Sequence, residues 1–140
     1  MFGSKLNIGL IFLVILLAML NCTTSKNGVP VKDSDTLEKI YIDKVDSDQS
    51  ISEAEKLQVR VSGNLPSPAY TFERFDVKVK GKVVEIIPLA KFDADKMVVQ
   101  VLVPFQEVCL VENLKPGTYN IQVHGRGDTV VKAESIHVKK

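Results

Sequence analysis

The stretch Leu114-Lys115-Pro116-Gly117-Thr118-Tyr119-Asn120-Ile121-Gln122-Val123-His124-Gly125 carries the strongest fold signal in this chain. Pro and Gly side by side are typical of a turn. The residues after the turn alternate, which predicts a strand with Tyr119, Ile121 and Val123 on one face. A turn that leads an aromatic residue into a strand can fix a corner between two sheets, so we expect a structural role for Tyr119.

Short strands separated by turn residues are predicted along most of the remaining chain. They cover Ile40–Val45, Leu57–Ser62, a segment around Phe75–Val79, Val83–Ile87, Met97–Val103, Phe105–Val111 and Thr129–Val138. Gly63–Pro68 is expected to end the second strand, and Gly125–Asp128 to form a tight hairpin before the last. Seven to nine short strands without an amphipathic helix predict an all-β fold, namely an antiparallel β-sandwich.

The corner residues Leu114, Pro116, Gly117 and Tyr119 resemble those of immunoglobulin-like and fibronectin III-like domains. In those domains the tyrosine oxygen hydrogen-bonds to backbone a few residues upstream, and the resemblance implies the same bond here. Ile121 stands where antibody domains carry a cysteine, and the chain has no tryptophan. The resemblance is therefore to bacterial Ig-like modules.

The N-terminus has the pattern of a secretory signal. Lys5 precedes an uncharged and mostly apolar run from Ile8 to Leu20. At about 1.5 Å per helical residue, such a run is too short for a hydrocarbon layer about 30 Å thick. We therefore expect residues 1–21 to be a signal peptide that is removed.

Cys22 follows this run at the place of a lipid-attachment cysteine. With Met19, Leu20 and Asn21 before it, the segment resembles the relaxed lipobox of spirochaete-type lipoproteins. The resemblance implies that Cys22 is diacylglycerylated and becomes the first residue of the mature protein. An ordinary signal peptide with a bystander cysteine is the alternative. Because Thr23 and not Asp follows Cys22, the resemblance implies the outer membrane.

The sequence divides into residues 1–21 as the signal peptide, residues 22–38 as a lipidated flexible tether and residues 39–140 as the Ig-like β-sandwich domain. The tether is predicted because residues 23–30 are polar, small and punctuated by Gly and Pro. Removal of residues 1–21 takes away Lys5 and no acidic residue, which leaves 17 basic and 17 acidic residues. A neutral mature chain does not indicate a nucleic-acid partner.

No constellation typical of catalysis stands out, so we expect no enzyme and no cofactor. Nucleophile motifs and a phosphate-binding loop are absent from the sequence. Asp93 and Asp95 have a spacing that also suits a loose calcium site, but a turn is favoured. His124, near Asp128, and His137 are too few for a metal site, and we predict none.

Cys109 and a group of lysines have ordinary structural explanations. Cys109 is expected to be an unpaired, buried thiol in a strand and not a reactive nucleophile. Lys78 and Lys80 are expected to face solvent and protect an exposed strand from pairing, while Lys82 lies in the following turn. Glycosaminoglycan binding is the alternative for these three lysines.

Arg126-Gly127-Asp128 is the sharpest short motif in the sequence. The same tripeptide at a hairpin tip is the integrin-binding signal of a fibronectin III module. The glycines around it are equally explained by a tight turn, which we favour.

Together these features predict a lipid-anchored cell-envelope protein that acts as a non-catalytic binding or structural module, with a membrane contact through its anchor and a protein as a possible partner. The alternative is a surface adhesin that binds host integrin-type receptors through Arg126, Gly127 and Asp128. A small-molecule substrate is not indicated.

Overall fold

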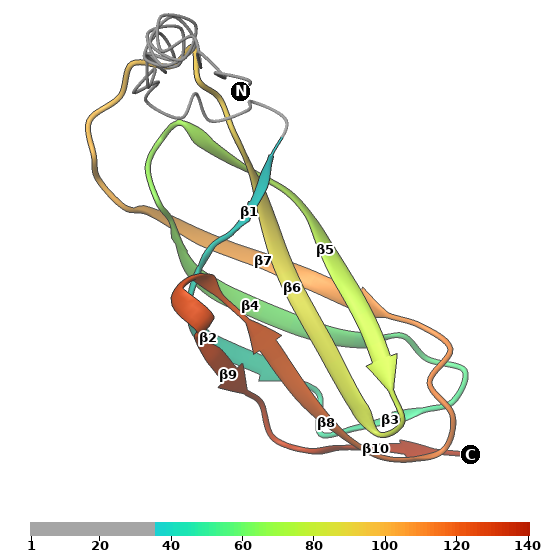
Figure 1. The fold of residues 1–140 in the computed structure, drawn as a ribbon. Coiled ribbons are helices and arrows are strands. Elements are labelled where there is room, and N and C mark those ends of the chain that lie inside the picture. Colours follow the sequence, from blue (N-terminus) through green and yellow to red (C-terminus); the bar gives the residue numbers. More distant parts are fainter. Residues whose placement is uncertain (1–35) are drawn as a thin grey trace, which may run out of the picture. The chain divides into compact units, whose positions relative to one another are not determined.

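The computed structural model describes residues 36–140, which form ten strands and one 3-10 turn (Figure 1). The strands are β1 (Leu37–Lys39), β2 (Tyr41–Ser47), β3 (Ser50–Ser52), β4 (Leu57–Leu65), β5 (Tyr70–Lys80), β6 (Val83–Phe92), β7 (Val103–Val111), β8 (Gly117–His124), β9 (Val130–Lys132) and β10 (Ile136–Lys139). The turn η2 (Arg126–Asp128) lies between β8 and β9. Within residues 36–140, no helix is long and apolar enough to span a membrane.

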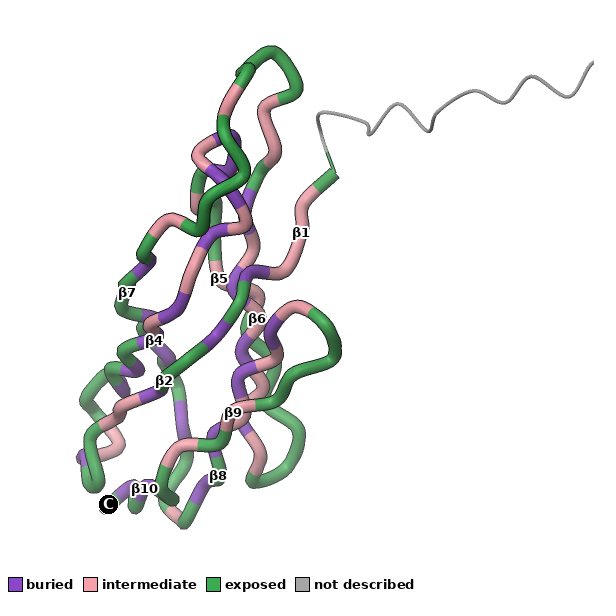
Figure 2. Tube along the Cα trace, turned by 90° about the vertical axis from the view of Figure 1, so that its left-hand side faces the viewer, coloured by how far each residue is buried: buried purple, intermediate pink, exposed green. Residues whose placement is uncertain are grey.

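The strands form two sheets, seen nearly edge-on in Figure 2. The smaller sheet has the order β2-β4-β7. The larger sheet has the order β1-β6-β8-β10-β3, with β5 on the other edge of β6 and β9 beside β8. The all-β sandwich predicted from the sequence is confirmed. Ten strands are present because several connections form strands of three residues.

Two strand pairs run parallel, although the sequence prediction was antiparallel throughout. β6 pairs with β8 over Val83–Ile86, and β3 pairs with β10. Between β6 and β8 the chain passes once through the other sheet, as β7, so β8 starts from the same end as β6 (Figure 1). In an Ig-like sheet the neighbour of the penultimate strand is antiparallel to it, so this strand order departs from the resemblance.

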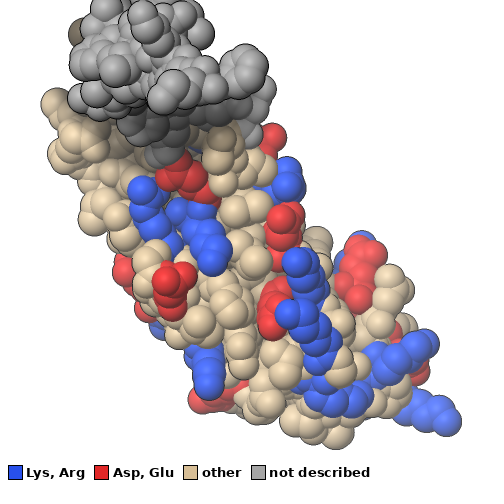
Figure 3. Space-filling model, in the orientation of Figure 1, with Lys and Arg blue, Asp and Glu red and all other residues tan. Residues whose placement is uncertain are grey.

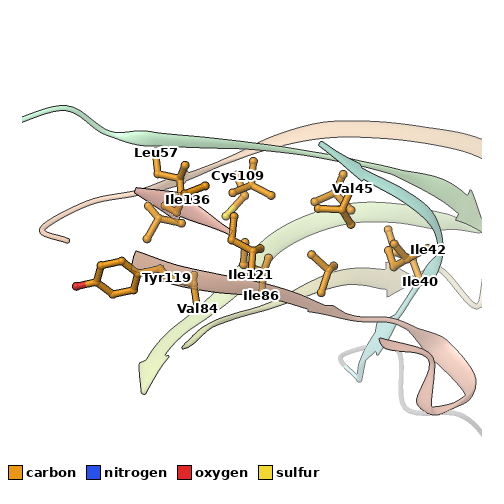
Figure 4. Close-up of a cluster of buried hydrophobic side chains, with 14 of the residues drawn as sticks. Ile40, Ile42, Val45, Leu57, Val84, Ile86, Cys109, Tyr119, Ile121 and Ile136 are labelled. Atoms are coloured by element: carbon orange, nitrogen blue, oxygen red, sulfur yellow. The ribbon is translucent and has the colours of Figure 1, made fainter. Parts of the chain in front are cut away.

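The core lies between the two sheets. Alternate residues of β4, β6 and β8 point inward and are fully buried; they include Leu57, Val59, Val61, Val84, Ile86, Ile121 and Val123 (Figure 4). Cys109 on β7 packs in the same cluster with only 2% of its surface exposed. Burial raises the pKa of the Cys109 thiol to about 11. The prediction of a buried free thiol is confirmed.

The prediction of a strand over Met97–Val103 is wrong. Residues 97–102 belong to the connection between β6 and β7, and β7 starts at Val103. The segment has the β-branched composition of a strand, but a strand also needs a hydrogen-bonding neighbour. β4 ends at Leu65, which pairs with Val103, so β4 extends no further beside this segment.

Other elements also differ from the sequence prediction. β4 continues through Gly63, because the backbone of β2 passes too close there for a side chain. β6 continues through Pro88, which lies between the stretches of β6 that pair with β8 and with β1. The last strand is divided into β9 and β10, and β1 lies where the tether was predicted to end.

Candidate functional site

The Arg126-Gly127-Asp128 segment forms the 3-10 turn η2 between β8 and β9. Gly127 has φ 69° and Asp128 has φ 57°, so both adopt the left-handed conformation. The amide of Gly125 donates to the carbonyl oxygen of Thr129 at 2.8 Å and closes the turn. The tight connection expected at this position is present, with the tripeptide forming a short helical turn.

The side chain of Arg126 is held against β1. Its Nη1 atom lies 2.8 Å from Oε2 of Glu38, and the hydroxyl of Tyr70 donates to the same oxygen at 3.1 Å. The backbone amide of Arg126 donates to the carbonyl oxygen of Ile40 at 2.8 Å. The guanidinium also lies 5.6 Å from the ring centre of Tyr41. We call Arg126, Glu38 and Tyr70 the β1 clamp.

The electrostatics of the β1 clamp favour the charged arginine. Burial opposes the charge of Arg126, but the neighbouring Tyr70 and Glu38 outweigh burial, so the pKa of Arg126 is raised. The Glu38 side chain is only 16% exposed, and both of its described contacts go to the same oxygen. The clamp therefore joins β1 to the turn and to β5 through one carboxylate.

Replacing Arg126 by Ala should destabilise the domain by about 1 kcal/mol, because a partly buried carboxylate loses its charged partner while solvent weakens the effect. Chemical denaturation with Asp128→Asn as the matched control measures this difference. The control removes a charge from the same turn and keeps a residue that tolerates the left-handed conformation, so its stability should be nearly unchanged. Equal losses of stability for the two variants would contradict a stabilising role of the β1 clamp.

Tyr119 is buried at the edge of the core (Figure 4), and it shares one face of β8 with the buried Ile121 and Val123, as the sequence predicts. Its hydroxyl oxygen accepts a hydrogen bond from Nζ of Lys82 at 3.3 Å, and not from an upstream backbone group within the described chain. The same Nζ donates to the carbonyl oxygen of Pro116 at 3.1 Å and lies 4.4 Å from the centre of the Tyr119 ring. The partner implied by the Ig-like resemblance is therefore corrected: Lys82 from the β5–β6 hairpin holds this corner.

Replacing Tyr119 by Phe should cost about 1 kcal/mol of stability, because Lys82 loses one acceptor and keeps the ring and the Pro116 carbonyl. Thermal and urea unfolding give the value. Tyr41→Phe is the control, since Tyr41 is 40% exposed and the change there should be within about 0.5 kcal/mol. If the loss of stability for Tyr119→Phe also stays within about 0.5 kcal/mol, the hydrogen bond from Lys82 to the Tyr119 hydroxyl has no structural role.

The acidic and histidine candidates are not brought together. The amide of Asp95 donates to Oδ1 of Asp93 at 3.1 Å, which is a local turn, and Asp93 pairs with Lys96. Nε2 of His124 is buried without a hydrogen-bond partner, while His137 contacts the hydroxyl of Thr118. Among residues 36–140, no three His, Cys, Asp or Glu side chains are grouped as a metal site would require.

The three lysines do not form one basic surface. Lys78 and Lys80 are exposed on the edge strand β5, and Lys80 pairs with Glu85 at 2.8 Å. That pairing lowers the pKa of Glu85, chiefly through the hydrogen bond from Lys80. Lys82 is directed to Tyr119 instead. Charges of both signs lie side by side on the face shown in Figure 3.

The outer edge of β7 is an exposed apolar feature that the sequence reading missed. β7 is the last strand of the smaller sheet, and its outward residues Val108 and Leu110 are 42% and 52% exposed. A shallow polar depression borders Val108 and is lined by Asp46, Ser47, Asp48, Gln58 and Arg60. In the sequence, the apolar residues at successive positions of this strand could have indicated an exposed apolar face. Natural edge strands usually carry charges instead, as β5 does.

The fold defines the class of protein as an all-β, two-sheet sandwich domain. The family model described as the ORF11 beta-sandwich domain matches residues 59–133, which is more than half of the chain. The chain belongs to the ORF11 beta-sandwich domain family. No curated protein and no solved structure matches it. The lipidation candidate Cys22 lies outside the described residues.

Proposed function

We propose that this protein is a lipid-anchored, non-catalytic module of the cell envelope that recognises a protein partner through the open edge of β7. The observation that carries the proposal is the exposed pair Val108 and Leu110 on an edge strand of nine residues. An unpaired edge presents backbone donors and acceptors to an added strand, and its side chains provide selectivity.

The edge strands β5 and β7 differ in how open they are to such pairing. β5 carries Arg74, Lys78 and Lys80, and charged side chains on an edge disfavour the addition of another strand. From Val103 to Val111, β7 carries Glu107 as its single charged residue. A partner that adds a strand is therefore expected at β7 and not at β5.

The lipid anchor is supported by the position of Cys22, which follows the apolar run Ile8–Leu20 with only Asn21 between them. Residues 23–36 separate Cys22 from the first residue of β1, a span of 14. At roughly 5–6 Å times the square root of this number, the tether reaches about 20 Å. That distance lets the domain meet a partner close to the membrane surface.

Metabolic labelling with a fatty acid tests the anchor. The natural chain should take up the label and remain with the membrane fraction, and Cys22→Ala should lose both. Cys109→Ala is the matched control, because it removes the other cysteine and should keep the label. Label retained by Cys22→Ala would overturn the proposed anchor.

A photoreactive residue tests the recognition edge. When placed at Leu110 and activated on intact cells, it should yield a discrete protein adduct, whereas the same residue at Lys78 on β5 should not. Adducts of equal yield at both positions would contradict recognition through β7.

The proposal does not extend to integrin-type receptors. That recognition needs the arginine and the aspartate of the tripeptide to project into solvent, and Arg126 is paired with Glu38 in the β1 clamp. If Asp128→Glu reduced host-cell attachment, the adhesin alternative would be favoured again.

A further inference from the structure

We propose that the connection between β6 and β7 rests on the surface of the bilayer that holds the lipid anchor. This inference rests on the proposed lipid anchor. It concerns residues 97–102, which we call the apolar loop, and it assigns the lipid surface as the partner of that loop.

The apolar loop exposes more hydrophobic surface than its surroundings. Its exposed apolar residues are Met97, Val99, Val101 and Leu102, which are 99%, 70%, 49% and 58% exposed. From Met97 to Gln106 the sequence contains no charged residue. The upper left of Figure 3, where this connection runs in Figure 1, is correspondingly uncharged. A contiguous exposed apolar segment of this kind is typical of an interaction surface.

The apolar loop leaves the sandwich at the end where the tether joins it. β1 is antiparallel to β6, and Leu37 pairs with Lys91. β6 ends at Phe92, so the connection begins at Asp93, two residues beyond Lys91. The C-terminus lies near the opposite end, because Val138 pairs with Gly117 at the start of β8, which runs parallel to β6.

The length of the tether brings this end of the domain to the membrane. A span of 14 residues reaches about 20 Å on average, which is less than the ~33 Å length of the ten-residue strand β6. A domain held at Cys22 therefore presents the end with Leu37 and the apolar loop to the bilayer more often than its far end.

The chemistry of the apolar loop favours the apolar part of the interface over charged headgroups. The base of the connection carries both signs, with Asp93 lying 3.5 Å from Lys96. An electrostatic contact needs an excess of basic residues, whereas valine, leucine and methionine side chains gain by leaving water. The contact should therefore form on zwitterionic lipid and persist at high salt.

Depth-sensitive fluorescence quenching on the full, natively processed chain tests the inference. Met97→Cys carries an environment-sensitive thiol label, and the protein is placed at high salt in zwitterionic phosphatidylcholine vesicles that contain nitroxide-labelled phosphatidylcholine. Cys109 does not compete for the label, because only 2% of its surface is exposed and burial raises the pKa of its thiol. Lys140→Cys at the far end is the matched control.

Loss of most of the fluorescence at position 97, with little loss at position 140, is the expected result. In the Met97→Cys background, Val101→Asp and Leu102→Asp together should restore the fluorescence, because charged side chains are costly to place in the bilayer. These two residues are exposed in the domain, so the fold should tolerate the change.

The mass of the same preparation shows whether Cys22 is acylated. Acylated protein without quenching at position 97 would overturn the inference and leave the anchor intact. Protein without acyl chains would overturn the anchor and the inference with it. A blue shift that depends on protein concentration and is insensitive to nitroxide lipid would assign the apolar loop to a second copy, which also overturns the inference.

Discussion

Gly63→Ala is expected to destabilise the domain by about 3 kcal/mol, the upper part of the range for adding a methyl group to packed structure. Gly63 lies in the central strand β4, between Ile42 of β2 and Phe105 of β7. A Cβ atom there would overlap the carbonyl oxygen of Tyr41, and that backbone atom cannot rotate away. β2 would have to move, and with it the register irregularity between Ile42 and Lys44.

Comparing the urea unfolding of Gly63→Ala and Gly81→Ala separates two roles of glycine, which are to leave room for a neighbouring backbone and to adopt a positive φ. Gly81, in the loop of the β5–β6 hairpin, has φ 59° and open space around it, so alanine there should cost only about 1 kcal/mol through backbone conformation. A cost at Gly63 no larger than that at Gly81 would show that β2 accommodates the extra atom.

Ile121→Ala is expected to cost about 3 kcal/mol, because it removes three buried carbons from the centre of the core. Ile121 is fully buried on β8, opposite Val84 of β6 (Figure 4). Its carbonyl oxygen accepts a hydrogen bond from the amide of Ala133, which follows β9, so the backbone is held on both sides and collapse into the cavity is limited.

The change in denaturation midpoint at an unaltered m-value measures this cost. Ile121→Val removes a single carbon and should cost about 1 kcal/mol. Val108→Ala, on the exposed edge of β7, should cost less than about 0.5 kcal/mol. If Ile121→Ala behaved like Val108→Ala, the two sheets would not be packed as described.

The sequence predicted the parts of the fold that depend on local patterns. β8 and the turn before it follow from Pro116 and Gly117 and from the alternation after Tyr119. The inward residues of β4 follow from alternation in the same way. These features need only the period of a strand and the conformational preferences of turn residues.

The features that the sequence did not predict depend on distant parts of the chain. Residues 97–102 have strand composition but lack a partner, and partners cannot be read from composition. Gly63 looked like the end of a strand, whereas the reason for glycine lies in the approach of β2. Arg126 and Glu38 are 88 positions apart, so the β1 clamp has no local signature.

The position of β1 determines what happens when an anchored domain is pulled by a bound partner. A load on the tether reaches β1 first, and β1 is held by three residue pairs to β6 and by the β1 clamp. Detaching these three residues would lengthen the tether by about 10 Å at about 3.3 Å each. Core residues from Ile40 onward would keep their places, so β1 is expected to detach under load before the sandwich unfolds. Single-molecule pulling should show this detachment as a short first extension.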